Sequence, residues 1–117
     1  MGEPRIRVSA VLGWSEQILL CRVTYEPGKQ VPDHDHEHTE QVMAIVDGEV
    51  TVTVEGETRD VKAGDVIVIN RGVRHSLFSE NGVTFFEALA PVPLDHVPDR
   101  DRDLVVGPDG GSHHVER

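Results

Sequence analysis

Short apolar runs separated by turn residues are the feature that most constrains how this chain can fold. Asp47-Gly48 and Asn81-Gly82 are dipeptides that favour tight turns between strands. From position 50 to position 54 valine alternates with threonine, and this period of two is typical of a half-buried strand. No segment before Pro91 repeats its apolar residues with the period of a helix. The chain is therefore predicted to be all-β.

About eight strands are expected, and their close spacing is typical of a sandwich or a closed barrel. A chain of 117 residues forms one domain with its own core. We expect this domain to span residues 1–103, followed by a loosely held, flexible tail at 104–117, where glycine and proline are frequent. The expected strands lie at 6–12, 17–25, 41–46, 50–54, 58–61, 66–69, 75–79 and 83–89.

The acidic composition limits the partners of the chain. Its net charge of −10 repels phosphate backbones, so no nucleic acid partner is expected. No apolar stretch approaches the roughly 18 residues that a membrane-spanning helix needs, and the first residues lack the features of a signal peptide. A cytoplasmic protein that acts on a small molecule is expected. The single Cys21 lies in an apolar run and is expected to be a buried, unreactive thiol.

The segment from His34 to Gln41 concentrates residues that bind metals. It contains histidines at 34, 36 and 38, together with three acids and a glutamine. Histidine is the commonest protein ligand for metals. Residues i and i+2 of a strand point to one face, so His34 and His36 can aim at one point. Gln41 shares its face with the apolar residues at 43 and 45, which places it in the interior, whereas Glu40 faces the other way.

Two glycine-framed motifs carry a family resemblance. The first runs from Gly28 to Gly48 around the pair His34-x-His36, and the second runs from 64 to 79 and contains His75. In their order and spacing these motifs resemble those of the cupin family, over about residues 17–90. The resemblance implies a double-stranded β-helix, that is, a small jelly-roll barrel of two antiparallel sheets, and one divalent metal per chain. The ligands that it implies, and that the strand positions also favour, are His34, His36, Gln41 and His75.

The identity of the fourth ligand is open at this point. Spacing from His36 admits either Glu40 or Gln41, whereas spacing back from Gly48 and strand parity favour Gln41. His38 is expected at the rim of the site. The affinity order of divalent metals makes the ligands a poor guide to the ion, so Zn, Ni, Mn, Fe and Cu all remain candidates. The chain departs from the usual cupin motifs at three positions: Gln41 (usually Glu), Asn70 (usually Pro) and Ser79 (usually Asn).

A neutral ligand set leaves the metal with its full charge, which suits Lewis-acid chemistry on a carbonyl or hydroxyl oxygen. The leading hypothesis is an isomerase, lyase or cyclase; a metal-dependent dioxygenase and a non-enzymatic binding protein are the alternatives. The small cupins that open unsaturated sugar acids and those that assist polyketide ring closure resemble this chain. The former usually carry an arginine where this chain has Val92-Pro93-Leu94. The candidate catalytic residues are Glu87 for proton transfer, Glu40 at the rim, and Arg74 for contact with an anionic substrate.

A homodimer is expected for the assembly. The stretch at 6–11 is long enough to add as an edge strand to the sheet of a second copy. The resemblance points the same way, because cupins commonly dimerise.

Overall fold

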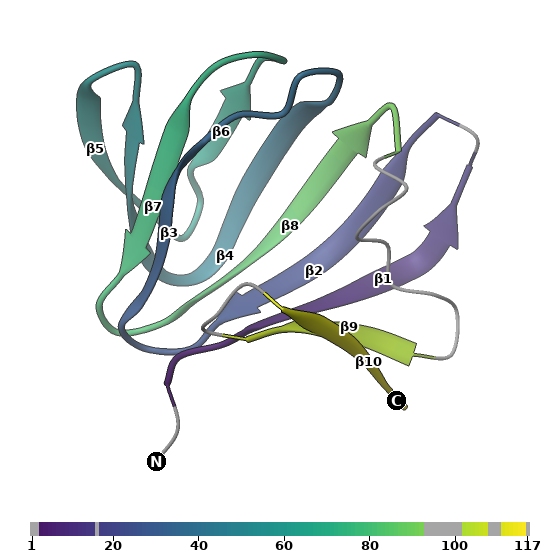
Figure 1. Ribbon diagram of the computed structural model, residues 1–117. Coiled ribbons are helices and arrows are strands. Elements are labelled where there is room, and N and C mark those ends of the chain that lie inside the picture. The colour runs from purple at the N-terminus through teal and green to yellow at the C-terminus, as the bar shows by residue number, and fades with distance from the viewer. Residues whose placement is uncertain (1–2, 16, 93–101, 108–110, 117) are drawn as a thin grey trace.

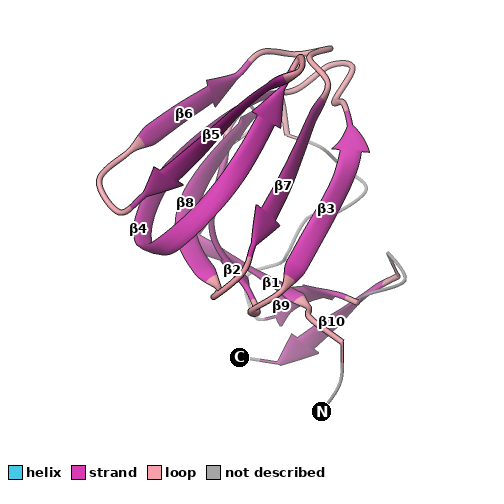
Figure 2. Ribbon diagram, turned by 90° about the vertical axis from the view of Figure 1, so that its left-hand side faces the viewer, coloured by secondary structure: helices cyan, strands magenta, loops and turns pink. Residues whose placement is uncertain are grey.

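The structure is a computed structural model that describes residues 3–15, 17–92, 102–107 and 111–116. These residues form ten strands and no helix, which confirms the all-β prediction. Figures 1 and 2 show the strands curling around a common interior. A helix long and apolar enough to span a membrane is not found in the described residues. The strands are β1 (Ile6–Trp14), β2 (Leu19–Tyr25), β3 (Lys29–His34), β4 (Glu40–Val54), β5 (Glu57–Lys62), β6 (Val66–Ile69), β7 (His75–Ser79), β8 (Val83–Ala90), β9 (Arg102–Val106) and β10 (Ser112–Glu116).

Strand β4 joins the two halves of the barrel. It is 15 residues long. Its first part pairs with β6 and β8, and its last part pairs with β5 and β7. The hydrogen-bonded order is β10-β9-β1-β2-β8-β4-β7-β3, with every pair antiparallel. This arrangement agrees with the predicted small barrel of two antiparallel sheets.

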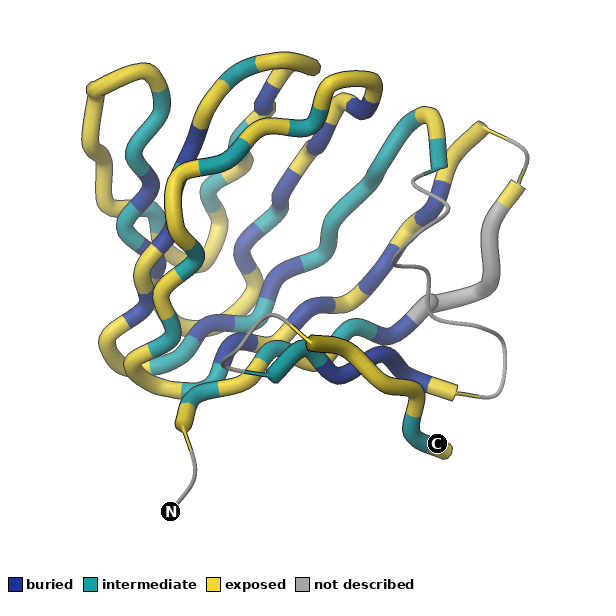
Figure 3. The backbone as a smooth tube through the Cα atoms, in the orientation of Figure 1, coloured by how far each residue is buried: buried dark blue, intermediate teal, exposed yellow. Residues whose placement is uncertain are grey.

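The core is built from rows of side chains that face each other across neighbouring strands. Buried and exposed residues alternate along β2, as Figure 3 shows, because successive side chains point to opposite faces of a sheet. Cys21 is fully buried, as expected, and burial raises the pKa of its thiol to about 12. Two of the inner rows are Leu19–Leu89–Gln41–Ile69 and Val23–Phe85–Ile45.

The expected hairpin at Asp47-Gly48 is wrong. The chain continues through this dipeptide as a single strand, with a shift of register against β8 between Ile45 and Asp47. Gly48 has a φ of +80°, which bends the strand without reversing it. The bend lets β4 leave one half of the barrel and enter the other.

The structure also differs from expectation in the last residues of the chain, in the environment of β1 and in the presence of β3. Residues 102–106 and 112–116 form β9 and β10, although a loosely held tail was expected at 104–117. Leu104 and Val105 are buried there, and burying these apolar side chains favours an ordered strand. β9 pairs with β1 from Ile6 to Val8, so this part of β1 is not the free edge that was predicted. Strand β3 was not predicted.

Candidate metal centre

Three histidines converge where β3 meets β7. His34 ends β3, His75 begins β7, and the two residues are directly paired in the antiparallel register. His36 follows in the loop toward β4, and its carbonyl oxygen accepts a hydrogen bond of 2.8 Å from the backbone N–H of Gly72. The ring centroids of His34 and His75 are 4.2 Å apart, and His36 lies 5.0 Å and 5.4 Å from them. One ring nitrogen from each histidine lies within 4.8 Å of the other two, so the three rings can face one small ion.

Backbone carbonyls fix the protonation of two of these rings. Nδ1 of His34 donates to the carbonyl oxygen of Pro32 at 2.7 Å, and Nδ1 of His75 donates to that of Val73 at 3.0 Å. A carbonyl oxygen only accepts, so in the neutral rings the proton resides on Nδ1 and the lone pair on Nε2. Metal-ligating histidines commonly donate their second nitrogen in this way, because the bond orients the ring.

Nε2 of His75 is a buried ring nitrogen that lacks a hydrogen-bond partner. The residue as a whole is fully buried. Burial lowers the pKa of His75, and the nearby His34 lowers it further, so the ring favours its neutral form. A buried acceptor without a partner costs free energy, and a metal ion at this nitrogen would remove that cost.

Gln41 and Glu87 form a polar pair on the inner face of the barrel. Nε2 of Gln41, on β4, donates a hydrogen bond to Oε1 of Glu87, on β8. This leaves the buried Oε1 of Gln41 without a partner. Burial raises the pKa of the Glu87 carboxyl to about 7, although the bond from Gln41 acts against this rise. The amide oxygen can therefore serve as a ligand atom, and the carboxyl has a pKa suited to proton transfer near neutral pH.

This set of donors fits a divalent transition metal. Imidazole nitrogen suits Zn, Cu, Fe and Ni, and the two unpartnered buried atoms, His75 Nε2 and Gln41 Oε1, are both lone-pair donors. No other group of three or more histidine, cysteine or carboxylate side chains converges in this way in the described part of the chain. His34, His36 and His75 would hold the ion, with Gln41 as the fourth candidate.

The remaining candidates lie outside this cluster. Glu40 is exposed, on the face of β4 opposite to Gln41, as strand parity predicted, and its catalytic role stays a prediction. His38, which was expected at the rim, is exposed, and its Nε2 lies 3.7 Å from Oε2 of Glu37. Arg74 is exposed, and its guanidinium is 2.7 Å from the carboxylate of Asp33. Its charge is thus largely balanced within the protein.

A cavity of about 260 Å³ extends from the cluster into the barrel. His34, His36, Gln41 and Glu87 line it, so the structure brings together the interior residues that the sequence singled out. Leu104 and Val106 of β9 also line this cavity, and sequence reasoning missed them. Their i, i+2 spacing was the available signal, because it places both side chains on one face of a strand.

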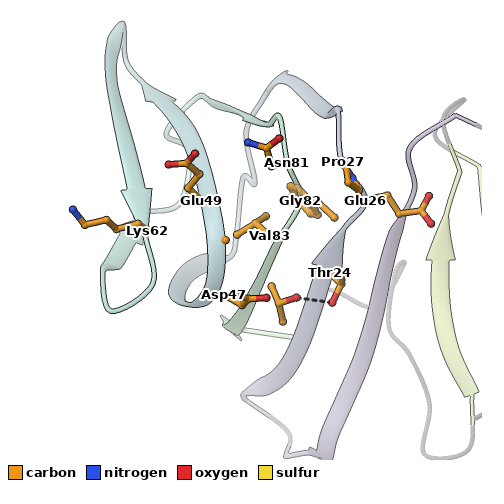
Figure 4. A pocket seen from close by; sticks show the side chains of 12 residues that line it. Thr24, Glu26, Pro27, Asp47, Glu49, Lys62, Asn81, Gly82 and Val83 are labelled. Carbon is orange, nitrogen blue, oxygen red and sulfur yellow. Dashed lines mark hydrogen bonds between the residues drawn. The ribbon is translucent and has the colours of Figure 1, made fainter.

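A second pocket is larger, at about 560 Å³, but carries no comparable chemistry. Figure 4 shows its side chains, among them Asn81 at the turn before β8, Glu49 and Lys62, and Thr24, whose hydroxyl is hydrogen-bonded to that of Thr84 at 3.1 Å. It shares no residue with the histidine cluster. The smaller cavity is therefore the better candidate for a functional site.

Comparison with known proteins identifies the family to which the chain is similar. A family model described as a cupin domain matches residues 21–85. The pectin degradation protein KdgF of Dickeya dadantii (strain 3937) is 26% identical over 86 residues, covering 73% of this chain and 78% of that protein. The tetracenomycin polyketide synthase protein TcmJ of Streptomyces glaucescens is 27% identical over 84 residues, covering 67% of this chain and 56% of that protein.

Solved structures share the fold. KdgF from Halomonas sp. has a TM-score of 0.73 at 22% identity, covering 79% of this chain and 85% of that one. An RmlC-like cupin from Shewanella frigidimarina has a TM-score of 0.70 at 25% identity, covering 83% and 84%. Because the family model spans more than half of the residues and the barrel matches those of solved cupins, the chain belongs to the cupin family.

Proposed function

We propose that this chain is a metal-dependent enzyme that isomerises, cleaves or cyclises a small oxygenated substrate. The observation that carries the proposal is the pair of buried, unpartnered lone-pair donors, His75 Nε2 and Gln41 Oε1. Gln41 lines the cavity together with Glu87 and with His34 and His36, whose rings converge with that of His75. Buried polar atoms without partners are rare in folded proteins, and both of these atoms carry a lone pair that suits a metal ion. Similarity to a pectin degradation protein and to a polyketide synthase protein supports an enzyme of small oxygenated compounds.

The ligand set determines the class of chemistry. A divalent metal bound by three imidazoles and an amide supplies Lewis acidity, which polarises a carbonyl or hydroxyl oxygen. The residues of the chain would orient the ligands, shape the cavity and move a proton. Hydrogen bonds to backbone carbonyls orient the rings of His34 and His75, and apolar side chains form most of the cavity wall. Glu87 lines the same cavity, so its carboxyl can take a proton from a bound substrate and return it to another atom.

Metal content tests the proposal directly. Elemental analysis of the purified chain should find about one transition metal ion per chain, and His75→Ala should lose tight binding, because the substitution removes a buried ligand. His38→Ala is the matched control, since His38 is an exposed histidine of the same segment, and this variant should keep the metal. Full metal retention in His75→Ala would overturn the assignment.

Activity is then sought on the metal-loaded chain with keto, enol and uronic acid compounds, while oxygen consumption is recorded. Turnover without oxygen uptake supports the proposal. Turnover that consumes oxygen would instead identify a dioxygenase. Tight ligand binding without any turnover would identify a binding protein.

A further inference from the structure

The cavity behind the histidines has two chemically different parts. Its polar part consists of His34, His36, Gln41 and Glu87. The other lining side chains come from β1, β2, β3, β7, β8 and β9 and are hydrophobic, including the thiol of Cys21 and the ring of Tyr25. At about 260 Å³ the cavity lies near the lower end of the range for small-molecule sites, which begins at roughly 300 Å³. Such a site fits a compact molecule with an oxygen at one end and an apolar body.

One wall of the cavity belongs to segments outside the matched cupin region of 21–85. Ile6 and Val8 of β1 are paired with Val106 and Leu104 of β9, and all four side chains line the cavity. Leu104 is 3% exposed, so its side chain lies in the interior of the barrel. The shape and polarity of this wall are therefore set by residues that the shared cupin motifs do not include.

The charges around the cavity disfavour an anionic ligand. No lysine or arginine is found among its described lining residues, and Glu87 places a carboxyl inside it. The nearby Arg74 is exposed, bonded to Asp33 at 2.7 Å, and 3.6 Å from the carboxylate of Asp35. A carboxylate that entered the apolar part would lose its hydration without gaining a cationic partner there, which is costly.

We propose that the cavity binds a small neutral oxygenated molecule with an apolar body, and that Leu104 and Val106 of β9 set this preference. The ligand oxygen faces the histidine cluster, and the apolar body lies against β1 and β9. A sugar acid fits the apolar part poorly on two counts, since its hydroxyl groups find few partners there and its carboxylate finds no lysine or arginine among the described lining residues. The inference rests on the proposed function only for the direction in which the ligand oxygen points.

Three probes separate the effects of charge and polarity. Cyclohexanone is neutral with an apolar ring, cyclohexanecarboxylate adds a charge to that ring, and galacturonate has both a charge and a polar ring. Each is titrated into the zinc-loaded and the metal-free full chain and followed by amide NMR shifts. In the metal-free form cyclohexanone should bind about tenfold more tightly than galacturonate. In the same form cyclohexanecarboxylate should also bind more weakly than cyclohexanone. Galacturonate binding to the metal-free chain as tightly as cyclohexanone would overturn the inference.

A matched pair of variants tests the wall. Leu104→Ala removes contacts with the apolar body and should weaken cyclohexanone binding about fourfold or more. Val105→Ala truncates a buried neighbour on the same strand that does not line the cavity, and it should leave binding unchanged. If Leu104→Ala does not fold, Val106→Ala replaces it, because Val106 lines the cavity and is only partly buried. Equal effects of the lining and the control substitution would refute the role of β9.

The two proposals can fail separately. Failure of the chain to bind any of the candidate transition metals would refute the metal-dependent function, while the metal-free titration still decides the ligand class. Conversely, a chain that binds a metal but prefers galacturonate in its metal-free form would keep the metal centre and lose this inference.

Discussion

Gln41 is the residue that decides which chemistry the cluster supports. Its amide donates to Glu87 and leaves Oε1 free as a neutral ligand atom. Gln41→Glu should keep the metal, because a carboxylate is at least as good a donor, yet turnover should fall by about tenfold because the added charge weakens the Lewis acid. The substitution also places two carboxyl groups together, and one of them will tend to hold a proton. Elemental analysis and steady-state rates measure the two effects.

The outcome separates the two classes of enzyme. Retained metal with reduced turnover agrees with Lewis-acid chemistry, whereas unchanged or increased turnover favours a dioxygenase, since a carboxylate supports a more oxidised metal. Gln41→Ala is the companion variant. If neither substitution changes metal affinity or activity, Gln41 is not a ligand.

The sequence predicts which residues belong to the site, but it does not predict the contacts between their side chains. Strand parity placed Gln41 inside and Glu40 outside, because alternate side chains share a face. It left Glu87 open between the interior and the surface, and the structure places it in the lining of the cavity. The bond between Gln41 and Glu87 depends on which residues of β4 lie beside which residues of β8. That register shifts between Ile45 and Asp47, and no local pattern encodes the shift.

Among the elements, the bend in β4 is the one that holds the two halves of the barrel together. Gly48 has a φ of +80°, and a Cβ at this position would overlap the carbonyl oxygen of Gly82. Gly56 has a similar φ of +84°, but a Cβ there would meet nothing within 4 Å. Both positions therefore strain a side chain, and only Gly48 adds a clash with neighbouring backbone.

This difference makes the two glycines a matched pair. Gly56→Ala should lower the free energy of unfolding by about 1–2 kcal/mol, the cost of a left-handed residue with a side chain. Gly48→Ala should lower it by roughly 2 kcal/mol more, because the backbone at Gly82 must move. Urea denaturation measures both values. Equal losses would show that the close approach to Gly82 does not constrain the bend.

The strands were predictable where the local pattern was simple. The expected strands at 66–69 and 75–79 match β6 and β7, since apolar runs with flanking turns define them. β3 was missed because Pro32 and Asp33 interrupt its pattern, and its partner β7 lies far along the chain. β9 and β10 were missed because their order comes from pairing with β1 and with each other. Composition around Gly107 indicated a loop, but long-range pairing decided the outcome.

At the scale of the molecule, the outer face of the sheet that contains β6, β4, β8 and β2 is unusually apolar. The strands β6, β4, β8 and β2 lie side by side (Figure 1), and two outward rows cross them. Val66 and Val68 are 63% and 62% exposed. Across both rows Arg22 is the one charged residue, in a chain with a net charge of −10. The rows are Val68–Val42–Ala88–Leu20 and Val66–Ala44–Phe86–Arg22.

We expect this face to pair with the same face of a second copy. Strongly acidic chains repel each other, so they associate best through a surface that carries little charge. Addition through β1, the route that the sequence suggested, is blocked from Ile6 to Val8 by β9. The four-strand face offers a broad apolar surface for an interface of standard size, about 800 Å² per partner. Light scattering at micromolar concentration should therefore give the mass of a dimer.

Two lysine substitutions test which surface is involved. Val68→Lys places a charge on the outer face, at its β6 edge, and should convert the dimer to a monomer, because the charge would lose its hydration in the interface. Phe78→Lys is the control, since Phe78 is an exposed apolar residue, 39% exposed, in a strand of the other half of the barrel. The control should remain a dimer. A monomeric mass for the unmodified chain would refute the homodimer, and a dimer that survives Val68→Lys would place the interface elsewhere.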